Sequence, residues 1–129
     1  MNWTNFLIVG CGGFLGAGGR YACSTLINQA ANHPFPFGTL IVNIFGAFLI
    51  GLISELFAVY APDKKRLLLF FTTGITGGFT TFSTFSLETL QLFEGGKAGL
   101  GMLNILLSLI CCFAGVFLGK LLVRQIVLS

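Results

Sequence analysis

The sequence TTGITGGFTTFSTFSLE, from Thr72 to Glu88, is the most informative part of this chain. It combines three glycines, eight hydroxyl side chains and three phenylalanines with a single charge, inside an apolar run from Leu67 to Phe93. Each glycine in a helix interior costs about 1 kcal/mol relative to alanine, so Gly74, Gly77 and Gly78 predict a broken helix. Irregular backbone and dense hydroxyl groups at membrane depth require burial in protein or a wet cavity. We therefore expect a broken membrane helix at the functional centre; the alternative is a small-residue seam for close helix packing.

The composition indicates an integral membrane protein. Of 129 residues, 55% are hydrophobic and 9% are charged, whereas a soluble domain carries roughly 25% charged residues. The net charge of +3 comes without a dense basic block, so no nucleic-acid partner is expected. The four cysteines show no CxxC spacing and predict small buried hydrophobes, with neither a disulfide framework nor a metal site. Membrane lipid is the expected surrounding, and the chain is expected to be a multi-pass protein of a cell membrane.

Four apolar segments are each long enough to cross a bilayer, which takes roughly 20 helical residues. They are Asn5–Ile27, Phe37–Tyr60, Leu67–Phe93 and Ala98–Val123, separated by short stretches with turn chemistry. No soluble domain is left over, so residues 1–129 are expected to form one all-α, four-span transmembrane domain. The third segment would be about 40 Å long as a straight helix, and a central break absorbs the excess over about 30 Å of hydrocarbon.

The distribution of basic residues and of polar groups predicts orientation and assembly. Five Lys and Arg residues fall at one side of the predicted spans and two at the other: Lys64, Lys65, Arg66, Lys120 and Arg124 against Arg20 and Lys97. This bias favours cytoplasmic termini. Four short helices cannot satisfy so many inward polar groups around their own core, so a homo-oligomer is expected, most simply a dimer.

Two pairs of side chains are candidates for holding a small anion. Thr39 and Asn43 are four residues apart and share a helical face, and the Asn43 amide offers two donors. Phe82 and Phe85 are three apart, and their ring edges carry positive quadrupole charge that could hold an anion without a formal cation. Ordinary aromatic packing is the alternative, because the chain contains fifteen phenylalanines.

A row of polar side chains lies beside these phenylalanines. Thr81, Thr84 and Glu88 share a neighbouring helical face, with Ser83 next to them. Such a row of hydroxyls ending in a carboxylate can replace water around a moving ion. Arg20, at the end of the first segment, either draws anions towards a pore mouth or extends to the membrane interface.

Three stretches together resemble a known family. They are GTLIVN (Gly38–Asn43), GITGGFTTFSTFSLET (Gly74–Thr89) and the glycine-rich first segment that ends in Arg20-Tyr21. They resemble the Fluc fluoride channels, also called CrcB, in motif order and over the whole chain length. The resemblance implies passive, fluoride-selective export through an antiparallel, dual-topology homodimer with two pores along its interface. In a bacterial cell it implies the inner membrane.

The resemblance also implies roles for individual residues. It places pore residues at Phe82, Phe85, Asn43 and Thr39, and a polar track at Ser83, Thr84 and Glu88. It implies that the backbone carbonyls of Gly77 and Thr80, from both subunits, hold a central structural sodium ion. Arg20, Ser108 and Cys112 complete the set of pore candidates. The chain departs from many relatives at two positions, with Cys112 in place of a pore serine and Asn104 in place of a tyrosine; a thiol is the weaker donor.

Three other functions compete with a fluoride channel. A small proton-coupled multidrug exporter also has four short spans, but it needs an acid at the centre of a span. The first segment has no acid, and Glu88 lies about one turn from the end of the third. A structural subunit of a larger membrane complex would show no fluoride flux by itself. An enzyme is not expected, because no nucleophile–base pair or metal-ligand cluster is visible.

Overall fold

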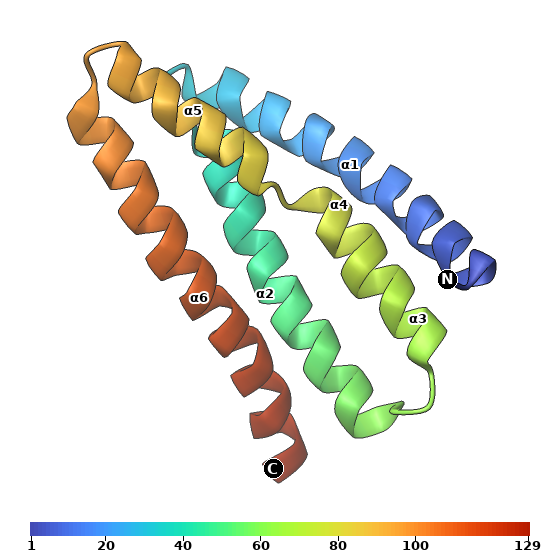
Figure 1. Cartoon of the computed structure of the whole chain (residues 1–129). Helices are drawn as coiled ribbons and strands as arrows, with labels where there is room; N and C mark the ends of the chain where they lie inside the picture. The colour runs from blue at the N-terminus through green and yellow to red at the C-terminus, as the bar shows by residue number, and fades with distance from the viewer.

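The computed structural model describes all 129 residues, and every regular element in it is a helix (Figure 1). In chain order the elements are α1 (Trp3–Ala31), α2 (Phe37–Tyr60), α3 (Lys65–Leu69), the π-helix η1 (Phe70–Thr76), α4 (Gly77–Phe79), α5 (Phe82–Glu94) and α6 (Ala98–Leu128). By length and composition, α1, α2 and α6 could each cross a membrane. The third predicted span is divided among α3, η1, α4 and α5. The prediction of an all-helical fold with several apolar spans is therefore confirmed.

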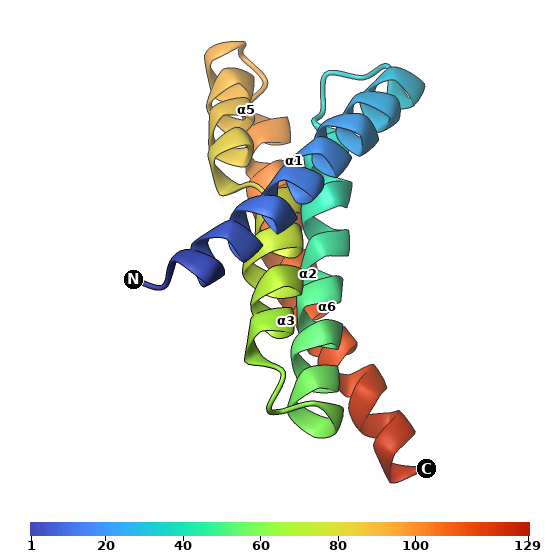
Figure 2. The same cartoon turned by 90° about the vertical axis from the view of Figure 1, so that its right-hand side faces the viewer.

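The outer helices are longer than the sequence predicted. Helix α1 has 29 residues and α6 has 31, and at 1.5 Å per residue α6 is about 46 Å long. A helix that exceeds about 30 Å of hydrocarbon must tilt or extend beyond it. Figure 2 shows α1 crossing the other helices at a steep angle.

Local capping explains where α1 begins and ends. The Asn2 side chain accepts hydrogen bonds from two N–H groups of the first turn, at 2.9 and 3.3 Å, which satisfies donors that have no intrahelical partner. At the other end, Asn32 adopts a left-handed conformation with φ 44°, and its N–H donates to the Asn28 carbonyl. Pro34 and Pro36 follow and cannot extend the helix. The chain therefore turns here and starts α2.

Helices α2 and α6 lie side by side along most of their length (Figure 1), because glycines let their backbones approach closely. A Cβ atom added at Gly51 would collide with the Val116 carbonyl, and one added at Gly119 would collide with the Phe48 carbonyl. Near the C-terminal ends of both helices, the Glu55 carboxylate accepts hydrogen bonds from Arg124 Nε and Lys120 Nζ. This pair of helices is the frame against which the third span is placed.

The third span is broken, as predicted. Between α4 and α5 the backbone is extended at Thr80, with φ −87° and ψ 158°, and at Thr81, with φ −151° and ψ 119°. Figure 1 shows the resulting step in the chain between the two helical halves. The break exposes backbone groups that a continuous helix would have paired, and side chains from other elements must satisfy them.

The break lies just after the glycines rather than at them. Gly74, Gly77 and Gly78 lie in helical turns, and Gly77 has φ −64° and ψ −37°. These glycines instead allow close approach to α1: a Cβ on Gly78 would lie 2.7 Å from the Gly13 carbonyl, and one on Gly12 would lie 2.9 Å from Gly74 Cα. The glycines therefore serve close packing against α1. Thr80 and Thr81, which follow them, form the break.

Most of the chain's apolar surface is uncovered. Only 23 of the 129 residues are buried, and large side chains such as Phe14, Phe82 and Phe113 are exposed. Water is a poor solvent for such a surface, so lipid or another protein surface must cover it. Membrane lipid as the partner of this surface stays a prediction.

Candidate functional site

A cavity of about 280 Å³ lies where the broken span meets α2 and α6. Its walls bring together five residues predicted for the site from three elements: Asn43 of α2, Phe82 and Phe85 of α5, and Ser108 and Cys112 of α6. The break itself contributes Thr80 and Thr81 to the lining. The cavity is therefore built around the extended residues of the third span.

Asn43 holds the break in place. Its Nδ2 donates to the Thr81 carbonyl at 2.9 Å, and the Thr81 N–H donates to Asn43 Oδ1 at 2.8 Å. This reciprocal pair replaces two backbone hydrogen bonds that the extended residue cannot make within a helix. One of the two Nδ2 hydrogens is occupied in this way, which leaves one for a ligand, fewer than the sequence suggested.

The row of hydroxyls exists and begins at the first turn of α5. The Thr81 hydroxyl accepts from the Thr84 N–H at 3.1 Å and caps the helix, and the Thr81 and Thr84 hydroxyls are also 3.1 Å apart. Ser83 Oγ lies 3.3 Å from the same Thr81 hydroxyl. Because α5 begins beside the cavity, the partial positive charge of its N-terminus is directed there.

Phe82 and Phe85 are neighbours with different surroundings. Their ring centroids are 5.3 Å apart and the ring planes are inclined by 52°. Phe85 is 7% exposed, whereas Phe82 is 73% exposed. Within one chain, Phe85 therefore forms part of the inner wall and Phe82 stands at the open side of the cavity.

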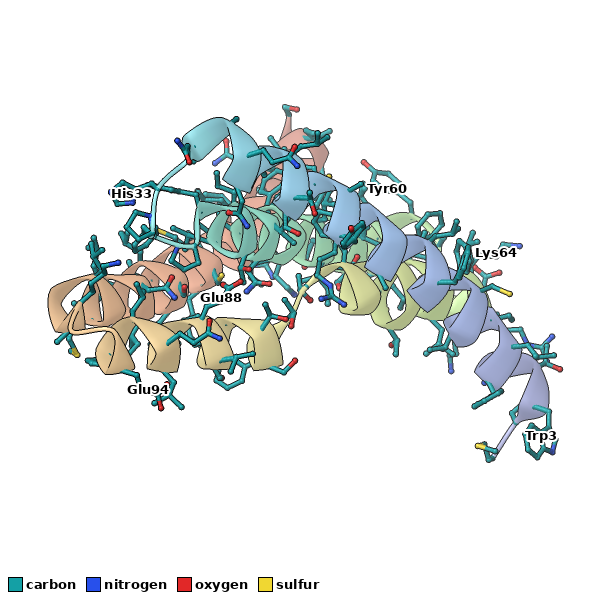
Figure 3. All side chains as sticks on the ribbon, turned by 90° about the horizontal axis from the view of Figure 1, so that it is seen from above. Trp3, His33, Tyr60, Lys64, Glu88 and Glu94 are labelled. Carbon is teal, nitrogen blue, oxygen red and sulfur yellow. The ribbon has the colours of Figure 1, made fainter.

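Glu88 and Thr39 lie outside this cavity. Thr39 Oγ1 on α2 donates to Glu88 Oε1 at 3.0 Å, and Figure 3 shows Glu88 on the side of α5 that faces α2. Glu88 lines a second, more polar cavity of about 410 Å³, with His33, Gln91 and Lys97 among its other walls. Thr81 thus lines the first cavity and Glu88 lines the second, whereas Ser83 and Thr84, between them on α5, line neither.

Arg20 is tied to the broken span. Its Nε donates to the Gly78 carbonyl at 3.1 Å, across 58 residues of sequence. The half-buried side chain thus satisfies a carbonyl next to the break, and neither cavity includes it in its lining. Arg20 therefore does not simply extend to the membrane interface. A role for Arg20 in attracting anions stays a prediction.

The break also releases the two carbonyls predicted to bind sodium. In a continuous helix the Thr81 N–H would bond the Gly77 carbonyl, and the Thr84 N–H would bond the Thr80 carbonyl. Here the first donates to Asn43 and the second to the Thr81 hydroxyl. Backbone carbonyls are oxygen ligands of the kind that hard cations prefer. The donor set therefore fits such an ion, although two oxygens are too few to enclose it.

Sequence reasoning missed a buried polar contact between α5 and α6. Asn104 is 1% exposed and donates from Nδ2 to Thr89 Oγ1 at 2.9 Å. It does not line either cavity, although its neighbour Ser108 does. A polar side chain in an apolar helix requires a hydrogen-bond partner, but the sequence does not show which residue that partner is.

Comparisons with known proteins place the chain in a family. Residues 7–120 match the family described as CrcB-like protein, Camphor Resistance (CrcB). A protein of Ruminiclostridium cellulolyticum named fluoride-specific ion channel FluC is 57% identical over 122 residues, 95% of this chain and 94% of its own length. Proteins of the same name from Clostridium perfringens and Agrobacterium fabrum are 49% and 45% identical, covering 92% and 95% of this chain and 92% and 98% of their own lengths.

The family match covers the parts of the chain that form the fold and the first cavity. The matches extend over nearly the whole chain, including the broken span and all the cavity-lining residues. Together with the three long apolar helices, they describe a multi-pass membrane protein. The chain belongs to the CrcB-like protein family.

Proposed function

We propose that this chain is a fluoride-selective ion channel that lets fluoride leave the cell passively, and that it is not an enzyme. The observation that carries the proposal is the cavity in which an amide, two phenyl rings and the start of a helix converge on one space. The relatives named fluoride-specific ion channel FluC, up to 57% identical, support the same conclusion.

The cavity suits a small, strongly hydrated anion. The remaining Asn43 amide hydrogen, the edges of Phe82 and Phe85 and the N-terminus of α5 all present positive partial charge. None of them is a formal cation, so an ion can enter and leave without being trapped. Selectivity is proposed to come from a passage that, once a second copy of the chain covers its open side, is too narrow for larger halides.

Passive export follows from the chemistry of fluoride. Hydrogen fluoride crosses the bilayer uncharged and ionises in the cytoplasm, where the anion is trapped. An open pore lets the membrane potential drive the anion outwards, at about 2.3 kcal/mol per charge per 100 mV. No nucleotide-binding motif and no covalent step are needed.

The second polar cavity and the hydroxyl row extend the path. Ser83, Thr84 and the Thr39–Glu88 pair are proposed to replace water around the ion between the cavity and the aqueous phase. Arg20 is proposed to stabilise the break from α1 by holding the Gly78 carbonyl. Cys112 and Ser108 are proposed to form the α6 side of the passage.

A second copy of the chain is proposed to close the pore. Phe82 is 73% exposed beside a cavity that is open on that side, and the α6 face next to it carries the exposed Phe113. A two-fold antiparallel dimer would cover both copies of this face and create two equivalent pores. Each chain would insert in either orientation.

The same arrangement would complete the proposed sodium site. Gly77 and Thr80 of each copy would contribute two carbonyls, and a pair of copies would contribute four. Gly77 is exposed in the single chain, as an interface position requires. A bound sodium ion would supply positive charge to carbonyls that the break has released, and its role would be structural.

Fluoride efflux from liposomes that contain only the purified chain tests the proposal. A fluoride electrode should record rapid efflux driven by a potassium gradient with valinomycin, without a proton gradient and with little accompanying chloride. Phe85→Ile should abolish most of the flux, and Phe14→Ile, a matched change on an exposed part of α1 away from both cavities, should not. Proton-dependent uptake of an aromatic cation would favour an exporter, and absence of any flux would favour a structural subunit.

A further inference from the structure

We propose that Asn104 is a positioning residue that sets the place of α5 along α6, and with it the place of Phe85 at the cavity wall. The inference rests on the proposed function, because it assigns Asn104 a part in shaping the same site without contact with the ion. It concerns a side chain that does not line the cavity.

One continuous chain of hydrogen bonds connects the two helices. Asn104 Nδ2 donates to Thr89 Oγ1 at 2.9 Å, and the Thr89 hydroxyl donates to the Phe85 carbonyl at 2.7 Å. On the other side, Ser108 Oγ donates to Asn104 Oδ1 at 3.4 Å. The amide thus lies between two cavity-lining residues, Phe85 on α5 and Ser108 on α6.

The break makes such a contact necessary. Thr80 and Thr81 are extended, so the direction of α5 is not inherited from α4 as it would be in a continuous helix. The Asn43–Thr81 pair and the Thr39–Glu88 hydrogen bond hold α5 against α2, but neither contact sets the place of α5 along α6. A directional contact with α6 is required for that.

Apolar packing alone does not supply that direction. The side of α5 that is buried carries Phe85, Thr89 and Leu92, spaced at i, i+4 and i+7. Contacts of phenylalanine and leucine are non-directional, and a shift by one turn, about 5.4 Å, would exchange one apolar contact for another. The same shift would leave the Asn104 Nδ2 group buried without its acceptor on α5, which is unfavourable. A single buried asparagine in an apolar helix interface specifies register in this way.

The test uses the native thiol of Cys112, which lines the cavity, as a reporter of the position of α5. In a background with the other three cysteines replaced by alanine, labelling by a small neutral thiol reagent is compared for four variants of the purified protein. These are Asn104→Leu, Thr89→Val, the double variant and the conservative Thr89→Ser, which keeps the hydroxyl. Thermal stability and fluoride efflux are measured on the same samples.

Each single apolar variant should change the Cys112 labelling rate by on the order of tenfold and reduce efflux by a similar factor, because each deletes the Asn104–Thr89 hydrogen bond that fixes α5 along α6. Thr89→Ser should stay close to the wild type in both. The double variant should be more stable to heat than Thr89→Val, since it no longer buries an Asn104 amide without an acceptor, but should keep the altered labelling and the low efflux. That separation distinguishes positioning from mere stabilisation.

Two outcomes would overturn the inference. One is labelling within about twofold of the wild type in all variants; the other is efflux and labelling that recover together with stability in the double variant. If the wild-type chain conducts no fluoride, the proposed function fails. The labelling and stability measurements then still decide whether Asn104 positions α5.

Discussion

Replacing Asn43 by alanine should loosen the break in the third span. The change removes both hydrogen bonds to Thr81, at 2.8 and 2.9 Å, and Thr81 is buried. A buried backbone group left without a partner costs about 1–3 kcal/mol. Because water can enter through the adjacent cavity, we expect the lower half of that range, about 1–2 kcal/mol of local opening free energy.

Amide hydrogen exchange measures this quantity directly. Each 1.4 kcal/mol lost from the free energy of local opening speeds exchange about tenfold, so exchange at residues 80–84 should be about 5- to 30-fold faster in Asn43→Ala. Mass spectrometry of the peptides that cover the break gives the rate. Fluoride efflux should fall as well, because the variant also lacks the amide donor.

Asn2→Ala is the matched control. It also deletes an amide that bonds two backbone positions, but these lie in the first turn of α1. Its effect on exchange should be confined to that turn and should leave residues 80–84 unchanged. Exchange at the break that is the same in Asn43→Ala as in the wild type would refute the conclusion that Asn43 holds it.

Three further predictions concern the cavity, the proposed sodium site and the close contact of α1. Phe82→Ile and Phe85→Ile should each reduce fluoride efflux sharply while the assembly state, measured by light scattering, is unchanged; full efflux in both variants would remove the pore assignment. Thr80→Ala should retain bound ²²Na⁺, because the proposed ligand is a backbone carbonyl; loss of the ion would show that the side chain binds it. Gly16→Ala should lower the thermal stability, since its Cβ would collide with a carbonyl of η1, whereas Gly18→Ala, where nothing lies within 4 Å, should not; equal melting temperatures would contradict the predicted contact.

The number and type of elements could be predicted from sequence because these depend on local composition. Runs of apolar residues with turn chemistry between them identified α1, α2 and α6 and located the third span between residues 67 and 93. The break in that span was also expected, since its residues are poor helix formers. Its exact residues were not evident, because glycine propensity alone does not show that packing keeps residues 74–78 helical and leaves Thr80 and Thr81 extended.

The structure brings together only part of the predicted set of site residues. Asn43, Phe82, Phe85, Ser108 and Cys112 line one cavity, whereas Thr39, Ser83, Thr84, Glu88 and Arg20 do not. Their hydrogen-bond partners were not evident, as the contacts of Arg20 with Gly78 and of Asn104 with Thr89 show. Helical periodicity says which side chains share a face of one helix and nothing about what the face meets.

Composition and the spacing of turn residues suffice to indicate a membrane protein and the number of its segments: 55% hydrophobic and 9% charged residues are not the composition of a soluble domain. Tertiary packing sets the residues at which the helix of the third span breaks, and it sets which side chains form hydrogen bonds with the unpaired backbone groups there. The reason is that the Asn43–Thr81 pair joins residues 38 apart and the Arg20–Gly78 contact joins residues 58 apart. Such partners become available to the unpaired backbone only when the helices have packed.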